Sequence, residues 1–245
     1  DRASLTGSPG RGPKKMSDRR AESTMTAMTD IDAECELVET LPSLQPADTF
    51  CFRCHPQAAC FNQCCSDLRL ELTPYDALRL RRALDIPARR LLLEYTEVGR
   101  DPQNGFPVVM LRMREDEQRT CPFVRESGCK VYADRPGACR SYPVGRGAEF
   151  LGGGEIAEQF VLVREEHCLG LDDGPAWTAR EWMKDQGMQE YIRYNDRYMS
   201  LISRWHESGR KLDEQQAQAV LLALYQSDDL GAVMQLERLA KLIGG

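Results

Sequence analysis

Four cysteines fall within twelve residues of this chain, from Cys54 to Cys65, and the last two of them are adjacent. A second group of cysteines follows downstream, over residues 121–168. The eight cysteines of the two groups are Cys54, Cys60, Cys64, Cys65, Cys121, Cys129, Cys139 and Cys168. Thiolates are strong ligands for zinc and for the iron of iron–sulfur clusters, and a site normally takes four of them. We therefore predict that these eight side chains are metal ligands.

The adjacent pair Cys64 and Cys65 bears on the number of metal positions. In extended backbone, neighbouring side chains point to opposite sides. Two adjacent cysteines therefore serve two metal positions more readily than they chelate one ion. We expect either one polynuclear centre or two centres that lie back to back, with the two groups of four thiolates as ligands.

The spacing C-x5-C-x3-C-C over residues 54–65 matches neither the two-cluster ferredoxin motif nor the paired CxxC motifs of zinc ribbons. Cys51 forms a CxxC motif with Cys54, so Cys51 is an alternative ligand to Cys54. Cys35 lies among acidic residues, far from the others in sequence, and we do not assign it as a ligand.

The composition favours metal over disulfide bonds. The chain has 245 residues and ten cysteines, and no secretion signal is evident. In a reducing compartment such a cluster indicates metal, and we expect a cytoplasmic protein. The alternative is a disulfide framework in an exported protein, which is typical of much smaller domains. The net charge of −6 gives no reason to expect nucleic acid as a partner, and no apolar run is long enough to span a bilayer.

The pattern of elements predicts an α+β fold, with a small, irregular, cysteine-rich metal-bound core of short strands and helices and a C-terminal helical segment. We divide the chain into a disordered tail (1–48), a cysteine-cluster metal-binding domain (49–172) and the C-terminal helical segment (173–245). The first twenty residues contain six Lys or Arg and almost no large apolar side chains, which is typical of disorder.

Short strands are predicted at 68–72, 106–113 and 158–164, where apolar residues alternate or form short runs. Between the first two, Thr73 followed by proline is typical of a helix start, and a second helix follows through residue 95.

After residue 175 the pattern becomes helical. Thr178 and Glu181 have the spacing of a capping box, and we predict one long helix from there to about Trp205, weakened at Gly187. Two further helices are predicted, at 213–226 and 230–243.

Basic side chains stand beside the cysteines, namely Arg53, Lys130, Arg135 and Arg140. Neighbouring cations offset the negative charge of thiolates, and hydrogen bonds from them tune a cluster's potential. We assign Arg135 and Arg140 as cofactor-binding residues, with an ordinary surface charge as the alternative for each. His55 and His167 also adjoin cysteines, and we expect both to lie outside the ligand set.

An ordered series of motifs accompanies the cysteines. It comprises Cys54, Cys60, Cys64-Cys65, Leu72-Thr73-Pro74-Tyr75-Asp76, Cys121-Pro122-Phe123, Gly128-Cys129, Val131-Tyr132, Asp134-Arg135-Pro136 and Cys139-Arg140-Ser141-Tyr142-Pro143. Over roughly residues 50–170 this series resembles the YkgJ-type cysteine-cluster family of zinc- or iron-chelating domains. The spacing between Cys54 and Cys60 is wider than in that family's first motif, which leaves Cys51 as the substitute for Cys54.

The resemblance implies a metal-binding protein, and members of the family are often described as iron–sulfur oxidoreductases. The cysteine block also resembles that of flagellin lysine N-methylases, although this chain has no evident additional catalytic domain. Our first hypothesis is an iron–sulfur protein with [4Fe–4S] clusters that works in electron transfer with a protein redox or assembly partner.

Other functions remain open at this point. One is a structural-zinc module that mediates protein interaction. Another is a metallo-enzyme related to protein lysine methylation, so that whether the chain is an enzyme stays undecided. Metal delivery would require labile metal, whereas closed sites of four thiolates hold metal tightly.

Overall fold

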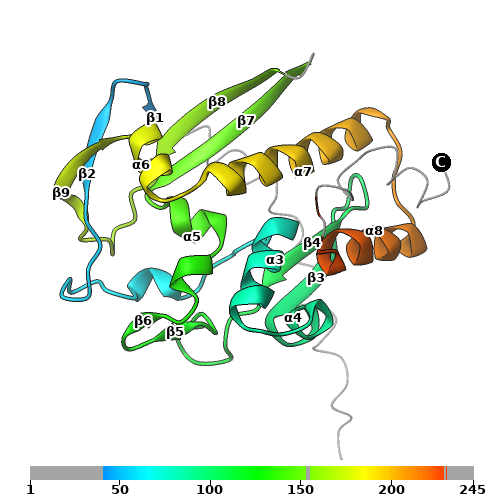
Figure 1. Cartoon of the computed structure of the whole chain (residues 1–245), viewed down its shortest axis with the longest axis horizontal. Helices are drawn as coiled ribbons and strands as arrows, with labels where there is room; N and C mark the ends of the chain where they lie inside the picture. The colour runs from blue at the N-terminus through cyan, green and yellow to red at the C-terminus, as the bar shows by residue number, and fades with distance from the viewer. Residues whose placement is uncertain (1–40, 153–154, 229, 231–245) are drawn as a thin grey trace, which may run out of the picture. The chain divides into compact units, whose positions relative to one another are not determined.

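The computed structural model of the chain describes residues 41–152, 155–228 and 230 (Figure 1). Most of the predicted tail (1–48) and nearly all of the predicted helix 230–243 lie outside these residues. Within them the chain forms six α-helices and nine short strands, so the predicted α+β class is confirmed. The helices are α3 (Pro74–Ala83), α4 (Ala88–Tyr95), α5 (Gly137–Ser141), α6 (Ala179–Asp185), α7 (Gln189–Glu207) and α8 (Glu214–Gln226).

The strands form small antiparallel sheets in the order β1-β8-β7, β2-β9, β3-β4 and β5-β6. Their bounds are β1 (Ser43–Leu44), β2 (Thr49–Phe52), β3 (Thr96–Arg100), β4 (Pro107–Leu111), β5 (Val124–Arg125), β6 (Gly128–Cys129), β7 (Val144–Gly152), β8 (Glu155–Leu162) and β9 (Leu171–Thr178). Two short 3-10 helices are η2 (Gln63–Cys65) and η3 (Tyr132–Asp134).

Helix α3 begins as its sequence predicts. Thr73 and Asp76 form a capping box, in which the Asp76 carboxylate accepts from the Thr73 N–H at 2.9 Å. The other oxygen of Asp76 accepts from the backbone N–H of Gly137 at 2.8 Å, and Asp76 is buried. This side chain therefore joins the start of α3 to the start of α5, the short helix that carries Cys139.

The predicted strand 68–72 is wrong in detail. Only Glu71 forms a β-bridge, to Met110 of β4, although Leu70 and Leu72 are buried and hydrogen-bond to β4 through their backbones. The segment runs from the turn after Cys65 to the N-cap of α3. It is too short to form a regular strand with a continuous series of hydrogen bonds to β4.

The single helix predicted from Thr178 to about Trp205 is two helices, α6 and α7. Gly187 has a φ of +63°, and the N–H of Met188 donates to the carbonyl of Met183 at 2.9 Å. This is the hydrogen bond with which a glycine in the left-handed conformation ends a helix. The glycine that was expected to weaken the helix therefore ends it.

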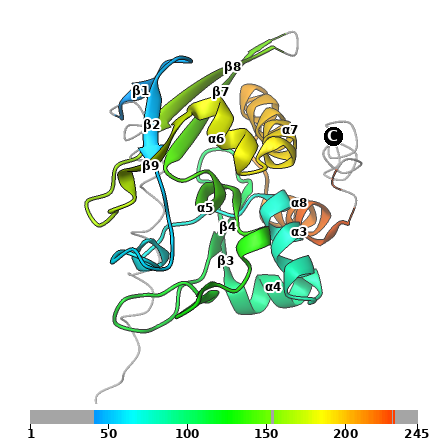
Figure 2. The same ribbon diagram turned by 60° about the vertical axis from the view of Figure 1, so that its left-hand side comes forward.

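The hairpin of β7 and β8 was predicted only in its second strand. Figure 1 and Figure 2 both show α7 alongside this hairpin. Arg146 of β7 makes ion pairs with Glu158 of β8 at 2.8 Å and with Asp196 of α7 at 2.7 Å, and its side chain is largely buried. These contacts attach the hairpin to the helix.

The described residues share one hydrophobic core. Phe52 of β2 packs against the ring of Trp182 in α6 with a centroid distance of 5.3 Å. The hydroxyl of Tyr225 in α8 donates to the carbonyl of Leu72 at 2.9 Å. The boundary predicted after residue 172 falls inside β9, which pairs with β2. The C-terminal helices thus pack into the core that supports the cysteine segments.

The capping boxes of α3 and α6 differ in burial, and their carboxyl groups differ accordingly. Burial raises the pKa of Asp76, although hydrogen bonds from Gly137 and Thr73 act in the opposite direction. Glu181 of α6 is exposed, and hydrogen bonds from Thr178 hold its pKa below the ordinary value.

Replacing each carboxyl by its amide should reveal pH dependences of opposite sign. The folded chain binds a proton at Asp76 more tightly than the unfolded chain, so the excess stability of wild type over Asp76→Asn falls as the pH rises above the ordinary aspartate pKa. The excess stability of wild type over Glu181→Gln is lost as the pH falls below the ordinary glutamate pKa, so it increases as the pH rises. Urea unfolding between about pH 3 and pH 7 measures both differences. Slopes of the same sign would contradict the opposite pKa shifts of Asp76 and Glu181.

Candidate metal centre

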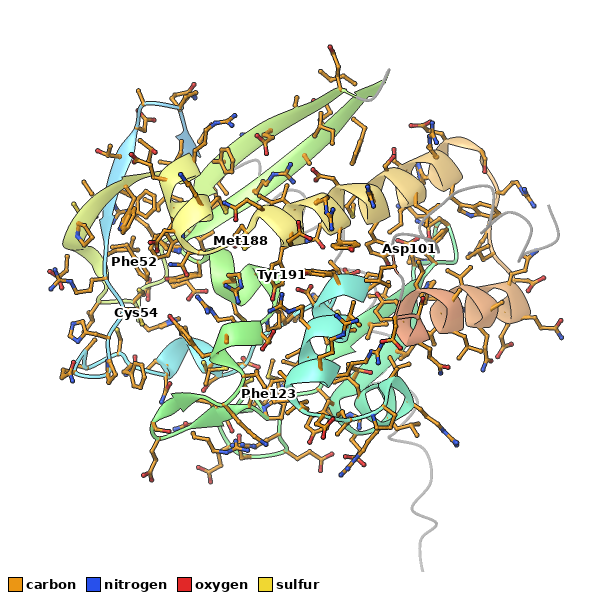
Figure 3. All side chains as sticks on the ribbon, in the orientation of Figure 1. Phe52, Cys54, Asp101, Phe123, Met188 and Tyr191 are labelled. Carbon is orange, nitrogen blue, oxygen red and sulfur yellow. The ribbon has the colours of Figure 1, made fainter. Side chains whose placement is uncertain are left out.

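Strand β2 ends at Phe52, and the first cysteine segment begins two residues later at Cys54 (Figure 3) and winds through a series of tight turns. The N–H of Phe61 donates to the carbonyl of Ala58, and that of Gln63 to the carbonyl of Cys60, each at 2.9 Å. Asn62 then adopts a φ of +71° before η2, which carries Cys64 and Cys65. Compact turns thus bring the four cysteines of this segment close together.

The second segment is fixed to the first through its backbone. The N–H of Cys121 donates to the carbonyl of Cys65 at 2.7 Å. Cys129 lies in β6 and is paired with Val124 of β5, so the hairpin folds back toward Cys121. The side-chain amide of Asn62 donates to the carbonyl of Arg125 at 2.9 Å, which ties the same hairpin to the first segment.

The third segment, around Cys168, lies against the first. The N–H of Arg53 donates to the carbonyl of Gly170 at 3.0 Å, and the N–H of Leu169 donates to the Sγ of Cys60 at 3.3 Å. A Cβ atom at Gly170 would lie 2.5 Å from the Arg53 carbonyl oxygen, and one at Gly174 would lie 2.7 Å from the Arg53 Cβ. The close approach of these segments therefore requires glycine at both positions.

A side-chain hydrogen bond joins Cys64 and Cys65. The hydrogen bond from Cys65 lowers the pKa of Cys64 to about 7, and the same bond together with burial raises the pKa of Cys65. Cys64 is the exposed member of the pair. The hydrogen bond thus favours the thiolate at Cys64 and the thiol at Cys65.

Burial is the main cause of the raised pKa values of four other thiols, and neighbouring thiols add to it. These four are Cys54, Cys121, Cys129 and Cys139. Desolvation and then the charges of Cys121 and Cys129 raise the pKa of Cys139 to about 12. The Cys139 side chain is nevertheless exposed, because a group can touch solvent on one side while protein desolvates the others.

The eight predicted ligands therefore lie in one neighbourhood, where each is linked to another by a hydrogen bond or by its effect on another thiol. Among the residues that the structure describes, no three His, Cys, Asp or Glu side chains are arranged so that they would hold a metal ion as they stand. The chemistry of the donors fits a thiophilic metal, because a bound cation relieves the repulsion among crowded thiolates. The donor set fits zinc and iron alike.

Three of the remaining candidates lie at the margin. Cys51 is in β2, where its register partner is Ala176 of β9. His55 contacts Gln57 at 3.2 Å, and His167 contacts Glu165 at 3.1 Å. Both histidines are thus engaged by side chains two residues away.

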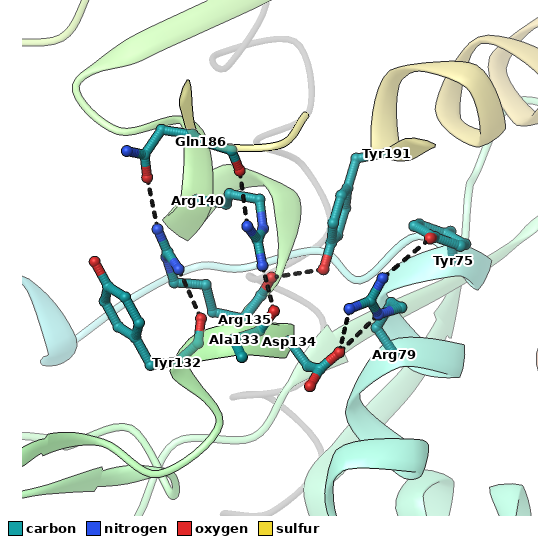
Figure 4. A network of polar contacts seen from close by, with 9 residues as sticks. All are labelled: Tyr75, Arg79, Tyr132, Ala133, Asp134, Arg135, Arg140, Gln186 and Tyr191. Carbon is teal, nitrogen blue, oxygen red and sulfur yellow. Dashed lines mark hydrogen bonds and ion pairs between the residues drawn. The ribbon is translucent and has the colours of Figure 1, made fainter. Parts of the chain in front are cut away.

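Arg135 and Arg140 both hydrogen-bond to Gln186 (Figure 4). Arg135 is buried, lies 3.9 Å from the centroid of the Tyr132 ring, and donates to the Gln186 side chain at 2.6 Å. Arg140 donates to the Gln186 carbonyl at 2.7 Å and lies over the ring of Tyr191. Within the described ranges, neither guanidinium makes an ion pair with a carboxylate.

The Nε of Arg140 is buried and has no hydrogen-bond partner in the described part of the chain. The charge of Arg135 lowers the pKa values of Cys54 and Cys129, against the larger effect of burial. Positive charge at this position therefore favours thiolates over thiols.

The sequence alone predicted no role for Tyr142, Gly170 or Gly174. The hydroxyl of Tyr142 is buried and has no hydrogen bond of ordinary geometry to a described residue. Burial and then the Cys168 thiol raise the pKa of Tyr142, so these two side chains are close. Tyr142 follows Cys139 by three residues, and this spacing was the signal that it lies near the site.

Residues 53–169 match the family model CxxCxxCC, which is described as a putative zinc- or iron-chelating domain. The match confirms the resemblance found in the sequence, and this segment is similar to that family's domain. The similarity supports metal binding through the cysteines. No curated protein and no solved structure matches the chain. None of the helices in the described ranges has the length and apolar character needed to cross a membrane.

The substitution Gly170→Ala tests whether the glycine contacts hold the site together. We expect a loss of about 1–3 kcal/mol in unfolding free energy, since an added methyl group forces Arg53 away from its hydrogen bond. Zinc bound per chain after reconstitution should fall as well, because Cys168 moves away from Cys54 and Cys60.

The control is Gly147→Ala, where the nearest atom to an added Cβ would be 3.9 Å away. Urea unfolding and zinc analysis are run on both variants. A Gly170→Ala chain with wild-type stability and zinc content would show that this close approach has no role.

Proposed function

We propose that residues 53–169 bind iron–sulfur clusters, of the [4Fe–4S] type, and that the chain works in electron transfer with a protein partner. The observation that carries the proposal is the gathering of eight thiols from three segments in one neighbourhood. A bound cluster would supply one-electron chemistry, and the cysteines would hold it. The protein's own contribution is to fix the thiols, partly exclude water and supply positive charge.

The ligands in this proposal are Cys54, Cys60, Cys64, Cys65, Cys121, Cys129, Cys139 and Cys168. Arg135 and Arg140 lie beside them and act on their charge. A cluster with its thiolates carries net negative charge, and guanidinium groups that lack a carboxylate partner are free to offset it. A surface arginine in an ion pair would not have this effect.

A protein partner in this proposal approaches the exposed side of the site. Cys54, Cys64 and Cys139 have exposed side chains. Tyr132 and Leu169, close in sequence to Cys129 and Cys168, are 63% and 61% exposed. Exposed aromatic and aliphatic side chains are typical of contact surfaces. We place the function in the cytoplasm, where thiols stay reduced.

Structural zinc is the second candidate, because the cysteine segments contain little regular structure of their own. The hairpin of β5 and β6 has two residues in each strand, and η2 has three. Metal cross-linking stabilises segments that cannot form a core alone. Zinc would serve this purpose without any redox chemistry.

Anaerobic purification followed by analysis of iron, acid-labile sulfide and zinc decides between the two candidates. Eight cysteines can hold two [4Fe–4S] clusters, so we expect about eight irons with matching sulfide per chain, or about four for a single cluster. The protein should be brown and show the EPR signal of a reduced cluster. A colourless protein with stoichiometric zinc would overturn the redox function.

Removal of the Arg135 charge should lower the reduction potential of the cluster. Reduction adds negative charge, and Arg135→Gln removes a nearby positive charge that stabilises it. The expected shift is on the order of tens of millivolts, because a partly buried charge acts through an effective dielectric constant of about 20.

Arg135→Lys is the matched control, since it keeps the charge and loses the planar stacking on Tyr132. Its potential should stay closer to that of wild type in a potentiometric titration followed by EPR. Equal potentials for Arg135→Gln and wild type would contradict an electrostatic role.

A further inference from the structure

Backbone contacts group the thiols differently from their order along the chain. The third cysteine segment bonds to the first, through Leu169 N–H to Cys60 Sγ at 3.3 Å and Arg53 N–H to the Gly170 carbonyl at 3.0 Å. Cys168 therefore lies beside the loop that begins with Cys54. If the cysteines were grouped by their order along the sequence, Cys168 would instead belong with the cysteines after residue 120.

The backbone of Cys65 bonds to the second segment. Its carbonyl accepts the N–H of Cys121, and the adjoining residues Ser66 and Thr120 form a β-bridge. The β5–β6 hairpin then folds Cys129 back toward Cys121. Cys65 is thus attached to the second segment, although its neighbour in sequence is Cys64.

Apart from those of Cys64, the mutual effects of the thiols follow the same division. Beyond the effect of burial, three thiols raise the pKa of Cys54, namely Cys64, Cys60 and Cys168. Apart from its bond to Cys64, Cys65 is acted on by two thiols, which are Cys121 and Cys139. Cys139 is acted on most by Cys121 and Cys129.

Cys64 lies nearest the boundary between these two groups. Its hydrogen bond joins it to Cys65, and its charge has smaller effects on Cys129 and Cys139. The two groups are therefore adjacent. The peptide unit between Cys64 and Cys65 is the place where one group ends and the other begins.

We propose that the chain binds two adjacent metal centres, each with ligands from two distant parts of the sequence. One ligand set is Cys54, Cys60, Cys64 and Cys168, and the other is Cys65, Cys121, Cys129 and Cys139. The inference rests on the metal binding in the proposed function and holds for zinc as well as for iron. Cys64 and Cys65, which are adjacent in η2 and joined by a side-chain hydrogen bond, then serve two centres that lie side by side.

Two double variants that share Cys168→Ser distinguish the proposed ligand sets from pairing in chain order, in which the first four of the eight cysteines bind one metal and the last four bind the other. Cys60→Ser/Cys168→Ser removes two ligands of one proposed set, and Cys129→Ser/Cys168→Ser removes one ligand from each. The full-length apo-chains are titrated anaerobically with Co²⁺, whose absorption reports tetrahedral thiolate sites, and bound cobalt is counted. Circular dichroism of each apo-chain checks the fold.

We expect two cobalt ions in wild type, one in Cys60→Ser/Cys168→Ser, and none held by four thiolates in Cys129→Ser/Cys168→Ser. Pairing in chain order gives the reverse result for the two variants, and that result would overturn the proposal. A single shared centre predicts that both double variants lose the same amount of bound cobalt. If both variants keep the same amount of cobalt, the two proposed ligand sets are also wrong. If wild type binds no cobalt, metal binding itself fails, which is distinct from a failure of the division.

A measurement on wild type keeps the test decisive if a variant does not fold. The apo-chain receives one equivalent of Co²⁺ and is then alkylated, and the protected cysteines are identified by mass spectrometry. Protection should rise and fall together within each proposed set, with Cys168 following Cys60 and Cys65 following Cys121. Joint protection of Cys64 with Cys65, and of Cys168 with Cys129, would overturn the division.

Discussion

Main-chain hydrogen bonds are the interactions on which the cysteine site depends. The carbonyl of Cys65 accepts the N–H of Cys121, and the N–H of Arg53 donates to the carbonyl of Gly170. These donors and acceptors do not change with the protonation of the thiols. The folded chain therefore brings the sulfur atoms together by itself. This crowding changes the ionisation of the thiols.

This consequence is visible in the ionisation of the side chains. A desolvated thiol beside other thiols resists losing its proton, and the raised pKa of Cys139, about 12, illustrates both effects. Protonated thiols can be crowded without strong repulsion, and a metal ion releases their protons when it binds. Apart from Cys64, whose pKa is lowered, the thiols with raised pKa values are thus tolerated as neutral groups in the apo-site, and a bound metal would compensate the charge of the thiolates.

The sequence predicts well where local chemistry decides the structure. The start of α3 follows from Thr73, Pro74 and Asp76, because a capping box needs only neighbouring residues. Gly187 indicated a weak point, but whether a glycine bends or ends a helix depends on the carbonyls that the next N–H groups reach, and here the N–H of Met188 donates to the carbonyl of Met183. The β2–β9 pairing was missed because it joins residues more than a hundred positions apart with no periodic signal.

The same distinction applies to the site. Thiolate ligands are recognisable from residue type alone, whereas their surroundings depend on contacts between distant segments. No sequence pattern singles out Gly170 or Gly174, and only the position of Arg53 reveals why a side chain would not fit there. Tyr142 was recorded as part of a motif, but its closeness to Cys168 requires the fold.

The arginines connect this geometry to function. A buried guanidinium without a carboxylate is costly, because hydrogen bonds to neutral oxygens and a tyrosine ring replace its hydration only in part. Arg135 is in this situation, and burial lowers its pKa. An anionic metal–thiolate centre alongside would offset that cost. A buried cation held close to these thiols is therefore better explained by a charged centre than by the folding of the apo-chain alone.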